Sequence, residues 1–550
     1  MRLTIDQSEI PEQDKSATVS LLLETIHHQA TYIQQLEDEI ARLKKHPPRP
    51  KIRPSSLNKD KNRDQDEKTG DADSKKKKRK KRPGSKKRKK TAKLTIHETV
   101  DVPVEPVPEN SRFKGYKEFV VQGIKICAHN VLYRLETYLS PDGQYICAQL
   151  AENIHGKHFS PELIAFAIYQ HCHCHVTRPL LLEQLQEIGI DISRGTLNNI
   201  LIENKDNFHL EKDRVLSAGL ETSAFINVDD TGARHQGQNG YCTLIGSPLF
   251  SWFESTASKS RINFLTLLRA GYTDFVINTE AIDYMKANKL AKAAVEPFIE
   301  NGPISFDNQS QWDDFLAKNQ IVKPRHIKIA TQAALLGAIV EHGIFDKLVI
   351  VSDDAGQFNV LCHALCWIHA NRAIDKVIAF TDQAKHDLAR VKDQIWLLYQ
   401  GLKDYKLNPN DDDKAKLEKM FDDIFTQTTA SALLNKALKR IYRNKAELLL
   451  VLQRPDIPLH NNLAENAIRE YVKKRKISGS TRSQAGRKCR DTFASLKQTC
   501  RKLGISFWQY LSDRIQGRNE IPDLSELIRH QSQCSGSYRI PYTSFPTFFT

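Results

Sequence analysis

The sequence predicts an α/β protein with a mixed central sheet, and two apolar segments carry that prediction. Residues 224–230 (AFINVDD) form a short apolar run that ends in carboxylates, and the segments YCTLIG and LFSWFE follow it around a GSP turn. Residues 347–353 (KLVIVSD) form a second run, continuous enough for a strand that is buried on both faces. A strand that ends in an acid and leads into a hairpin is how a ribonuclease-H-like sheet begins, so we expect such a core with helical insertions.

Composition limits the possible classes of protein. At about 150 residues per domain, the chain of 550 residues predicts several domains. No apolar stretch approaches the ~18 residues of a membrane span, and the polar N-terminus lacks the apolar segment of a secretory signal. The ten cysteines are scattered along the chain, which is typical of reduced thiols in a cytoplasmic protein and not of a disulfide framework.

Most of the positive charge lies in one segment. The formal net charge is +15, and residues 75–93 contain 14 Lys or Arg and no acid, which leaves +1 for the rest of the chain. Such a run cannot bury apolar surface, so we expect residues 47–96 to form a disordered basic linker. The partner that this charge predicts is a polyanion, with nucleic acid as the first candidate. A purely solubilising segment is the alternative.

Residues 1–46 are predicted to form a coiled-coil dimerisation helix. β-Branched residues recur at one seam position of a heptad repeat, and leucines with one polar break recur at the other: Val19, Ile26, Ile33 and Ile40, then Leu22, Gln29, Leu36 and Leu43. This pattern favours a parallel two-stranded coil. A helix packed on its own domain is the alternative, but the basic linker separates this helix from any core.

Residues 97–158 predict a small β domain. Two apolar runs, EFVVQGIKI and VLYRLETYL, precede a PDGQ turn and the segment YIC. Cys127 and Cys147 stand singly, whereas a zinc ribbon needs paired ligands such as C-x-x-C. We therefore expect a small sheet without metal.

Residues 159–215 predict helices in a helix-turn-helix arrangement. Ser160 and Ser193 are typical N-caps, and Gly189 ends the helix between them. The side chains expected to contact base edges lie at the start of the third helix: Arg194, Thr196, Asn198 and Asn199. An ordinary helical hairpin would give the same pattern.

Residues 171–175 (HCHCH) are dense in potential zinc ligands. On a helix, however, only His171, Cys174 and His175 share one face. No second cluster with ligand spacing completes a tetrahedral set. The pattern therefore favours a partly buried helix end over a metal site.

Three acids that are far apart in the sequence form the candidate catalytic group. Asp229 and Asp353 each end a predicted strand, and Glu465 lies in the first turns of a predicted helix. Acids placed in this way can converge on a divalent-metal site, and their hard oxygen ligands suit Mg²⁺ or Mn²⁺. Two such ions would stabilise the attacking and leaving oxygens of a phosphodiester. Taken singly, each acid is equally consistent with an ordinary surface carboxylate.

These motifs resemble those of the DDE-type transposases of insertion-sequence family 66. VDDT resembles the family's A-D-E-T motif at the first Asp, and CWIHANR resembles the G-C-W-A-H-A-R-R motif that follows the second. HNNLAEN with RKISGS resembles the D-N-N-x-A-E-R motif at the Glu and the R-K and G-S that follow it. The resemblance assigns catalysis and metal binding to Asp229, Asp353 and Glu465, and it covers roughly residues 95–525.

The resemblance also implies a domain order. It places a ribonuclease-H-like catalytic domain at 220–482 with insertions at about 279–345 and 375–455, a C-terminal helical region at 483–528, a tail at 529–550, and a degenerate zinc-ribbon-like domain at 97–158. His460 and Asn466 depart from the Asp and Arg that the family has beside its Glu. Glu280 and Asp283 follow a segment that also resembles the stretch before the second Asp, so they are rivals to Asp353.

The function that the resemblance implies is DNA transposition. Such an enzyme would bind the terminal inverted repeats of its insertion sequence, cut DNA strands with two Mg²⁺ or Mn²⁺ ions per site, and transfer the ends to target DNA. Further side chains expected to hold DNA are His369, Arg372, Lys474, Arg475 and Lys476. The expected partners are DNA, a second copy of the chain through the coiled coil, and accessory proteins of the same element. The expected location is the bacterial cytoplasm, on the nucleoid and away from the membrane.

Two other functions stay open at this point. The chain can be a DNA-binding protein whose nuclease-like domain is inactive. It can also be a metal-dependent nuclease that cuts DNA without joining it.

Overall fold

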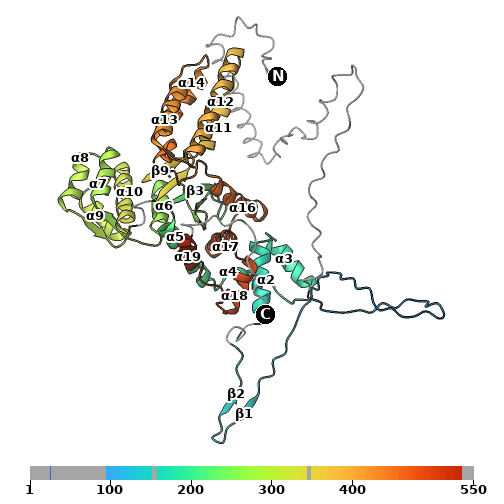
Figure 1. Cartoon of the computed structure of the whole chain (residues 1–550). Coiled ribbons are helices and arrows are strands. Elements are labelled where there is room, and N and C mark those ends of the chain that lie inside the picture. Colours follow the sequence, from blue (N-terminus) through green and yellow to red (C-terminus); the bar gives the residue numbers. More distant parts are fainter. Residues whose placement is uncertain (1–24, 26–94, 152–155, 157, 344–347, 535–550) are drawn as a thin grey trace, which may run out of the picture. The chain divides into compact units, whose positions relative to one another are not determined.

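A computed structural model describes residue 25 and residues 95–151, 156, 158–343 and 348–534 (Figure 1). The described chain is a mixed α/β structure whose centre is a five-stranded sheet. In spatial order its strands are β5 (Ser251–Thr256), β4 (Tyr241–Gly246), β3 (Phe225–Gly232), β8 (Val349–Ser352) and β9 (Cys362–Leu365). The strands predicted at 224–230 and 347–353, and the hairpin that follows the first of them, are therefore confirmed.

The sheet is antiparallel on one side of β3 and parallel on the other. β3 pairs antiparallel with β4, which pairs antiparallel with β5 across the short turn. β3 pairs parallel with β8, and β8 pairs parallel with β9. This mixed arrangement is consistent with a ribonuclease-H-like core. It also brings the carboxyl ends of β3 and β8 to one edge of the sheet, since parallel strands end on the same side.

Both faces of the sheet are covered. Ile226, Val228 and Ile350 belong to the largest apolar core, which includes helices before and after the sheet in the sequence. On the other face, Leu244 packs with residues of α16 (Asn462–Ser478), and Val351 packs in a core formed by the helices between β9 and α16. Because side chains alternate along a strand, Asp229 shares the α16 face.

Edge strand β5 is protected by side chains of α17 (Gln484–Leu503). The backbone N–H groups of alternate β5 residues donate to α17: Ser251 to Oγ1 of Thr499 (3.2 Å), Phe253 to Oγ of Ser495 (2.9 Å) and Ser255 to Oδ2 of Asp491 (2.9 Å). The three acceptors are four residues apart, so they lie on one face of the helix. They satisfy donors that would otherwise present an open sheet edge.

Between residue 158 and the sheet the structure describes four helices: α2 (Pro161–Cys172), α3 (Arg178–Glu187), α4 (Arg194–Ile202) and α5 (Asp206–Thr222). The predicted caps are confirmed, because Oγ of Ser160 accepts from the N–H of Leu163 and Oγ of Ser193 accepts from the N–H of Thr196. The helix-turn-helix assignment of α3 and α4 stays a prediction. The HCHCH segment spans the end of α2: His171 and Cys172 are its last residues, and the chain then leaves the helix, with a positive φ of 64° at His175.

Two groups of helices are inserted between the elements of the sheet. Between β5 and β8 lie α6 (Arg261–Leu268), β6 (Phe275–Ile277), α7 (Thr279–Ala287), α8 (Lys292–Glu300), β7 (Ile304–Phe306), α9 (Gln309–Lys318) and α10 (Pro324–Glu341). Between β9 and α16 lie α11 (Trp367–Asp375), α12 (Asp382–Tyr405), α13 (Asp411–Thr426), α14 (Ala432–Arg443), α15 (Lys445–Leu448) and the 3₁₀ helix η4 (Leu450–Leu452). After α17 come α18 (Phe507–Gln516) and α19 (Leu524–Cys534).

The β structure predicted before α2 is much smaller than expected. In the described part of residues 97–158, only β1 (Thr137–Leu139) and β2 (Tyr145–Cys147) form, as an antiparallel pair on either side of the PDGQ turn. Residues 118–126 (EFVVQGIKI) contain no strand, so that part of the prediction is wrong. Apolar side chains of this segment, such as Phe119 and Ile124, are exposed. An extended segment needs neighbouring strands or a covering layer to become a stable sheet, and the described residues supply neither here.

Several predictions fall outside the described residues. They are the coiled coil at 1–46, nearly all of the basic linker at 47–96 with its run at 75–93, and most of the tail at 529–550. The proposed domain boundaries stay predictions. Among the described helices, none is long and apolar enough to cross a membrane.

Lys502 on α17 gives the fold a predicted pH dependence. Its ammonium donates to the carbonyl oxygens of Ser247 and Phe250, both at 2.6 Å, in the turn between β4 and β5. Burial lowers the pKa of Lys502 from 10.5 to about 7. Between these values the unfolded chain binds the proton and the folded chain does not, so stability from this group rises with pH and is lost as pH falls through 7.

We expect Lys502→Met to remove this dependence. The stability of wild type relative to the variant should increase by up to about 1.4 kcal/mol per pH unit from pH 7 upward. Urea unfolding of both proteins across that window measures the difference. A constant difference between the two proteins would contradict the assigned burial of the ammonium.

Candidate active site at the ends of β3 and β8

The strand register brings Asp229 and Asp353 to one edge of the sheet. Asn227 on β3 pairs with Val351 on β8 in the parallel ladder. Asp229 is two residues beyond Asn227, and Asp353 directly follows Ser352, the last residue of β8, so both lie toward the carboxyl edge of the parallel pair. Two acids that are 124 positions apart in the sequence are therefore brought to the same carboxyl edge of the sheet.

Asn461 fixes the start of α16 against β3 and thereby positions Glu465. Its Nδ2 donates to the carbonyl of Val228 (2.8 Å), and its Oδ1 accepts from Nδ2 of Asn227 (2.8 Å). Its backbone N–H donates to Sγ of Cys366 (3.2 Å). Asn461 occupies the N-cap position of α16, but its side chain binds the strand and makes no capping hydrogen bond.

The charges of the three predicted acids act on one another. Burial, with a smaller effect from the negative charges of Asp353, Asp230 and Glu465, raises the pKa of Asp229 to about 7, while the N–H of Asp230 opposes the shift. That N–H donates to Oδ1 of Asp229 at 2.7 Å. The structure thus brings the trio into one electrostatic neighbourhood.

Glu465 lies among two arginines and a histidine. Its side chain is 15% exposed and lies 3.3 Å from Nη2 of Arg372, 3.4 Å from Nη2 of Arg469 and 3.7 Å from Nε2 of His369. Nη1 of Arg372 also donates to Nε2 of His369 at 2.8 Å. His369 and Arg372, predicted to orient a phosphate, therefore lie on α11 directly beside the predicted catalytic glutamate.

The other acids near these motifs are engaged elsewhere. Asp230 accepts hydrogen bonds from Oγ1 of Thr243 (2.5 Å) and Nε2 of Gln357 (2.9 Å). Asp354 pairs with Arg440. The rivals to Asp353 lie on α7, where Asp283 is 68% exposed and pairs with Lys286 at 3.9 Å, and Glu280 is exposed in the first turn.

No metal-binding cluster is assembled in the part of the chain that the structure describes: no three His, Cys, Asp or Glu side chains are grouped closely enough to hold an ion. The chemistry of the donor set nevertheless fits a hard divalent cation, because carboxylate oxygens are the ligands that Mg²⁺ and Mn²⁺ prefer. The raised pKa of Asp229 supports this fit, since a nearby cation would stabilise the ionised carboxylate.

Comparison with known proteins identifies this region. Residues 337–489 match the model of the transposase IS66 family. The chain is also 44% identical over 303 residues to the uncharacterized protein y4jO of Sinorhizobium fredii, an alignment that spans 55% of this chain and 94% of that protein. The chain belongs to the transposase IS66 family. Of the three predicted acids, Asp353 and Glu465 lie within the residues that match the family model, and Asp229 lies before them.

Membership of the transposase IS66 family implies a role in transposition and DNA as the substrate. Enzymes of the DDE transposase class transfer phosphoryl groups and typically use divalent metal ions. The roles of individual residues stay predictions.

The predicted DNA contacts on α16 differ in their surroundings. Lys474 is buried, and its ammonium donates to the carbonyl of His171 at 2.5 Å. Arg475 donates to Oγ1 of Thr231 (3.1 Å) and to the carbonyl of Gly232, so it binds the end of β3. Lys476 is exposed. Of these three side chains, Lys476 is therefore the one that is neither buried nor hydrogen-bonded to β3 in this structure.

The predicted base-reading residues line two different surfaces of α4. Arg194 and Asn199 are exposed and Thr196 is half-buried. Asn198 accepts a hydrogen bond from Nη1 of Arg178, and Asn198 and Arg194 line a cavity against α16 and α17. The helix is thus packed on the catalytic core along part of its surface.

A basic groove beside the acids was not predicted from the sequence. Its volume is about 530 Å³, and its cationic lining residues come from β5–α6 and α10: Lys259, Arg261, Arg325 and Lys328. Arg261 donates to the carbonyl of Gly356, and Gln357, which also lines the groove, donates to Asp230. These cations are isolated in the sequence, so no motif could reveal that they share a groove.

Proposed function

We propose that the protein is a transposase that cuts DNA strands at the terminal inverted repeats of an insertion sequence and joins the freed 3′ ends to target DNA. The observation that supports this most strongly is the parallel register of β3 and β8, which brings Asp229 and Asp353 toward one edge of the sheet, together with the charge interaction of both Asp353 and Glu465 with Asp229. Membership of the transposase IS66 family supports the same reaction class.

In this proposal Asp229, Asp353 and Glu465 hold two Mg²⁺ or Mn²⁺ ions. When bound, such ions activate a nucleophilic oxygen and neutralise charge that develops on a phosphodiester. The reaction is an in-line displacement: a water oxygen bonds to phosphorus, and the 3′ oxygen leaves and takes a proton. In joining, that 3′ hydroxyl attacks a target phosphodiester and displaces the 3′ oxygen of the target strand. One bond forms as one breaks, so no further energy source is required.

The chain's cations have distinct roles in holding the DNA. His369 and Arg372 orient the scissile phosphate, because they lie beside Glu465 and can donate charged hydrogen bonds. Lys476 and the groove that contains Lys259 and Arg261 bind the DNA backbone without sequence preference. Sequence reading belongs to α4 through Arg194, Thr196, Asn198 and Asn199, and the basic run at 75–93 adds affinity.

Synapsis of two transposon ends requires at least two protomers. The heptad pattern of residues 19–43 supplies the proposed contact between them. Accessory proteins encoded by the same element are further proposed partners.

A strand-transfer assay with pre-cut ends tests the proposal. Full-length protein, an oligonucleotide duplex that ends in the element's terminal repeat with a free 3′ hydroxyl, plasmid target and Mg²⁺ should yield joined products. A duplex with a 3′-deoxy end is the matched control, because it binds equally but has no nucleophile. Nicking of uncut ends without joining would favour a nuclease, and binding without either reaction would favour an inactive DNA-binding protein.

A further inference from the structure

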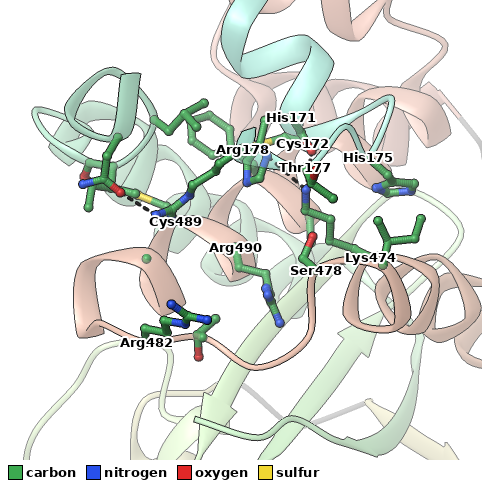
Figure 2. Close-up of a pocket in the computed structure, with 18 of the residues that line it drawn as sticks. His171, Cys172, His175, Thr177, Arg178, Lys474, Ser478, Arg482, Cys489 and Arg490 are labelled. Carbon is green, nitrogen blue, oxygen red and sulfur yellow. Dashed lines mark hydrogen bonds between the residues drawn. The ribbon is translucent and has the colours of Figure 1, made fainter. Parts of the chain in front are cut away.

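A second cavity, away from the acids, lies between the helices before the sheet and the helices after it (Figure 2). Its volume is about 700 Å³, within the range of about 300–1,000 Å³ of small-molecule sites. One wall is formed by the end of α2 and by α3 and α4, and the other by α16, the loop at 479–483 and α17. Neither the acids nor the reaction proposed above involves this cavity.

The charge of the lining is strongly positive. Six of the described lining residues are cationic, and Glu470 is the single acid among them: the cations are Arg178, Arg194, Lys474, Arg482, Arg490 and Lys497. Glu470 pairs with Lys473, which is not among the residues that line the cavity. Its Oε2 also lies 4.0 Å from Nζ of Lys497. Most of the positive charge therefore has no carboxylate partner within the cavity.

The cations repel one another in this arrangement. Burial, with a smaller effect from the charges of Arg490, Lys497 and Arg178, lowers the pKa of Lys474 to about 8. Burial also lowers the pKa of Arg178, with Arg490 adding to the effect. An anion placed among these groups would relieve the repulsion, so the cavity favours a negatively charged ligand.

The cavity is divided into a cationic rim and an apolar interior. Arg178, Arg194 and Arg482 are exposed at the rim. An added Cβ on Gly486 would lie 3.6 Å from Nη2 of Arg178, which places this guanidinium over the first turn of α17. The interior is lined by buried side chains that include Phe253, Tyr471, Phe493, Leu197 and Leu201. A ligand with a flat apolar part and an anionic end matches this division.

Three polar atoms that line the cavity are buried without a hydrogen-bond partner among the described residues: Nε2 of Gln498, Oγ of Ser478 and Nδ1 of His175. Gln498 is only 5% exposed. An unpaired buried amide costs free energy unless a ligand engages it. An amide and a hydroxyl can pair with the edge of a nucleobase, whereas an acyl chain would leave both unsatisfied.

We propose that this cavity binds a nucleoside phosphate that DNA presents as an unpaired nucleotide at a strand end. The phosphate lies among Arg178 and Arg482 at the rim, and the base enters the apolar interior toward Gln498. This inference rests on the proposed function, because that function identifies which DNA ends are bound. The existence of the nucleotide site does not depend on it. α4, predicted to read the repeat, forms part of the same wall, so strand-end and sequence recognition would be adjacent.

The test compares two DNA duplexes of equal total charge, one blunt and one with a short unpaired 3′ end, by fluorescence anisotropy with full-length protein in chelator. We expect the unpaired end to bind about ten-fold more tightly. Arg178→Gln/Arg482→Gln and, separately, Ser478→Phe should reduce the ratio to about one, the latter because it fills the cavity while every cation stays. Circular dichroism and the melting temperature of each variant confirm that it is folded.

The matched control is Arg487→Gln/Lys488→Gln, which removes two charges of the same helix, α17, from outside the cavity lining. It should weaken both duplexes and preserve the ratio. An equal affinity of wild type for the two duplexes, or an unchanged ratio in the cavity variants, would overturn the proposal. A deoxynucleoside monophosphate should compete with the unpaired end. Strong binding of the monophosphate without any preference for unpaired DNA would make a free nucleotide the ligand and overturn the assignment to DNA.

Because chelator prevents metal-dependent cleavage, this result is independent of catalysis. Failure of strand transfer with a preserved end preference would remove the proposed function and leave the nucleotide site. Normal strand transfer with no end preference would support the proposed function and rule out the nucleotide site.

Discussion

Asp229→Asn is expected to lower strand cleavage and strand transfer by about 10³-fold or more. The ionised carboxylate of Asp229 is destabilised by burial and by the neighbouring acids. An amide of the same size keeps the shape of the site but removes the negative charge that holds a cation. Rates with terminal-repeat duplexes in Mg²⁺ measure the effect, and anisotropy checks that DNA binding persists.

Two matched variants make this prediction specific. Asp354→Asn changes the acid next to Asp353, but Asp354 pairs with Arg440, so its rate should stay within a few-fold of wild type. Asp283→Asn tests the rival on α7 and should also leave the rate nearly unchanged. Loss of activity in Asp283→Asn with retention in Asp353→Asn would show that the second acid has been assigned wrongly.

Arg514→Leu is expected to lower the free energy of unfolding by about 3–5 kcal/mol. Glu211, 3% exposed, accepts from Nε of Arg514 (3.0 Å), the hydroxyl of Tyr510 (2.8 Å) and the N–H of Leu524 (3.1 Å). It therefore joins α5 to α18 and to the start of α19. Removal of the guanidinium leaves a buried carboxylate without its cation, and urea unfolding followed by circular dichroism measures the loss.

The double variant Glu211→Leu/Arg514→Leu removes both charges of the ion pair and so measures the cost of leaving Glu211 unpaired. It should recover part of the lost stability, because Glu211 is no longer left as a buried carboxylate without its cation, whereas Asp513 loses Arg514 in both variants. Arg529→Leu is the exposed control: Arg529 and Glu221 are 41% and 61% exposed, so its loss should be below about 1 kcal/mol. A double variant less stable than Arg514→Leu would contradict this account.

The sequence predicted the centre of the fold well because local patterns determine it. Continuous apolar runs end at Asp229 and Asp353, and serine caps with following helical segments define the starts of α2 and α4. β9 was not predicted, since its four residues, CHAL, carry too little pattern. The strand expected at 118–126 did not form, because apolar and β-branched composition alone does not supply a pairing partner.

The surroundings of the acids could not be derived in the same way. The side chain of Asn461 binds β3, a strand more than 230 positions earlier in the sequence, and a turn-like sequence gives no sign of that contact. Arg178 and Arg482 line one cavity although about 300 residues separate them. Lys474 and Arg475 belong to a basic stretch that suggests an exposed face, yet one is buried and the other binds β3. Only tertiary packing decides such roles.

The most direct test of the central claim is anomalous diffraction from crystals of the full-length protein soaked in Mn²⁺. The account predicts Mn²⁺ ligated by Asp229 and Asp353, with Glu465 completing the site, and loss of that Mn²⁺ in Asp229→Asn. Mn²⁺ absent from these carboxylates, at a concentration that supports strand cleavage in solution, would contradict it.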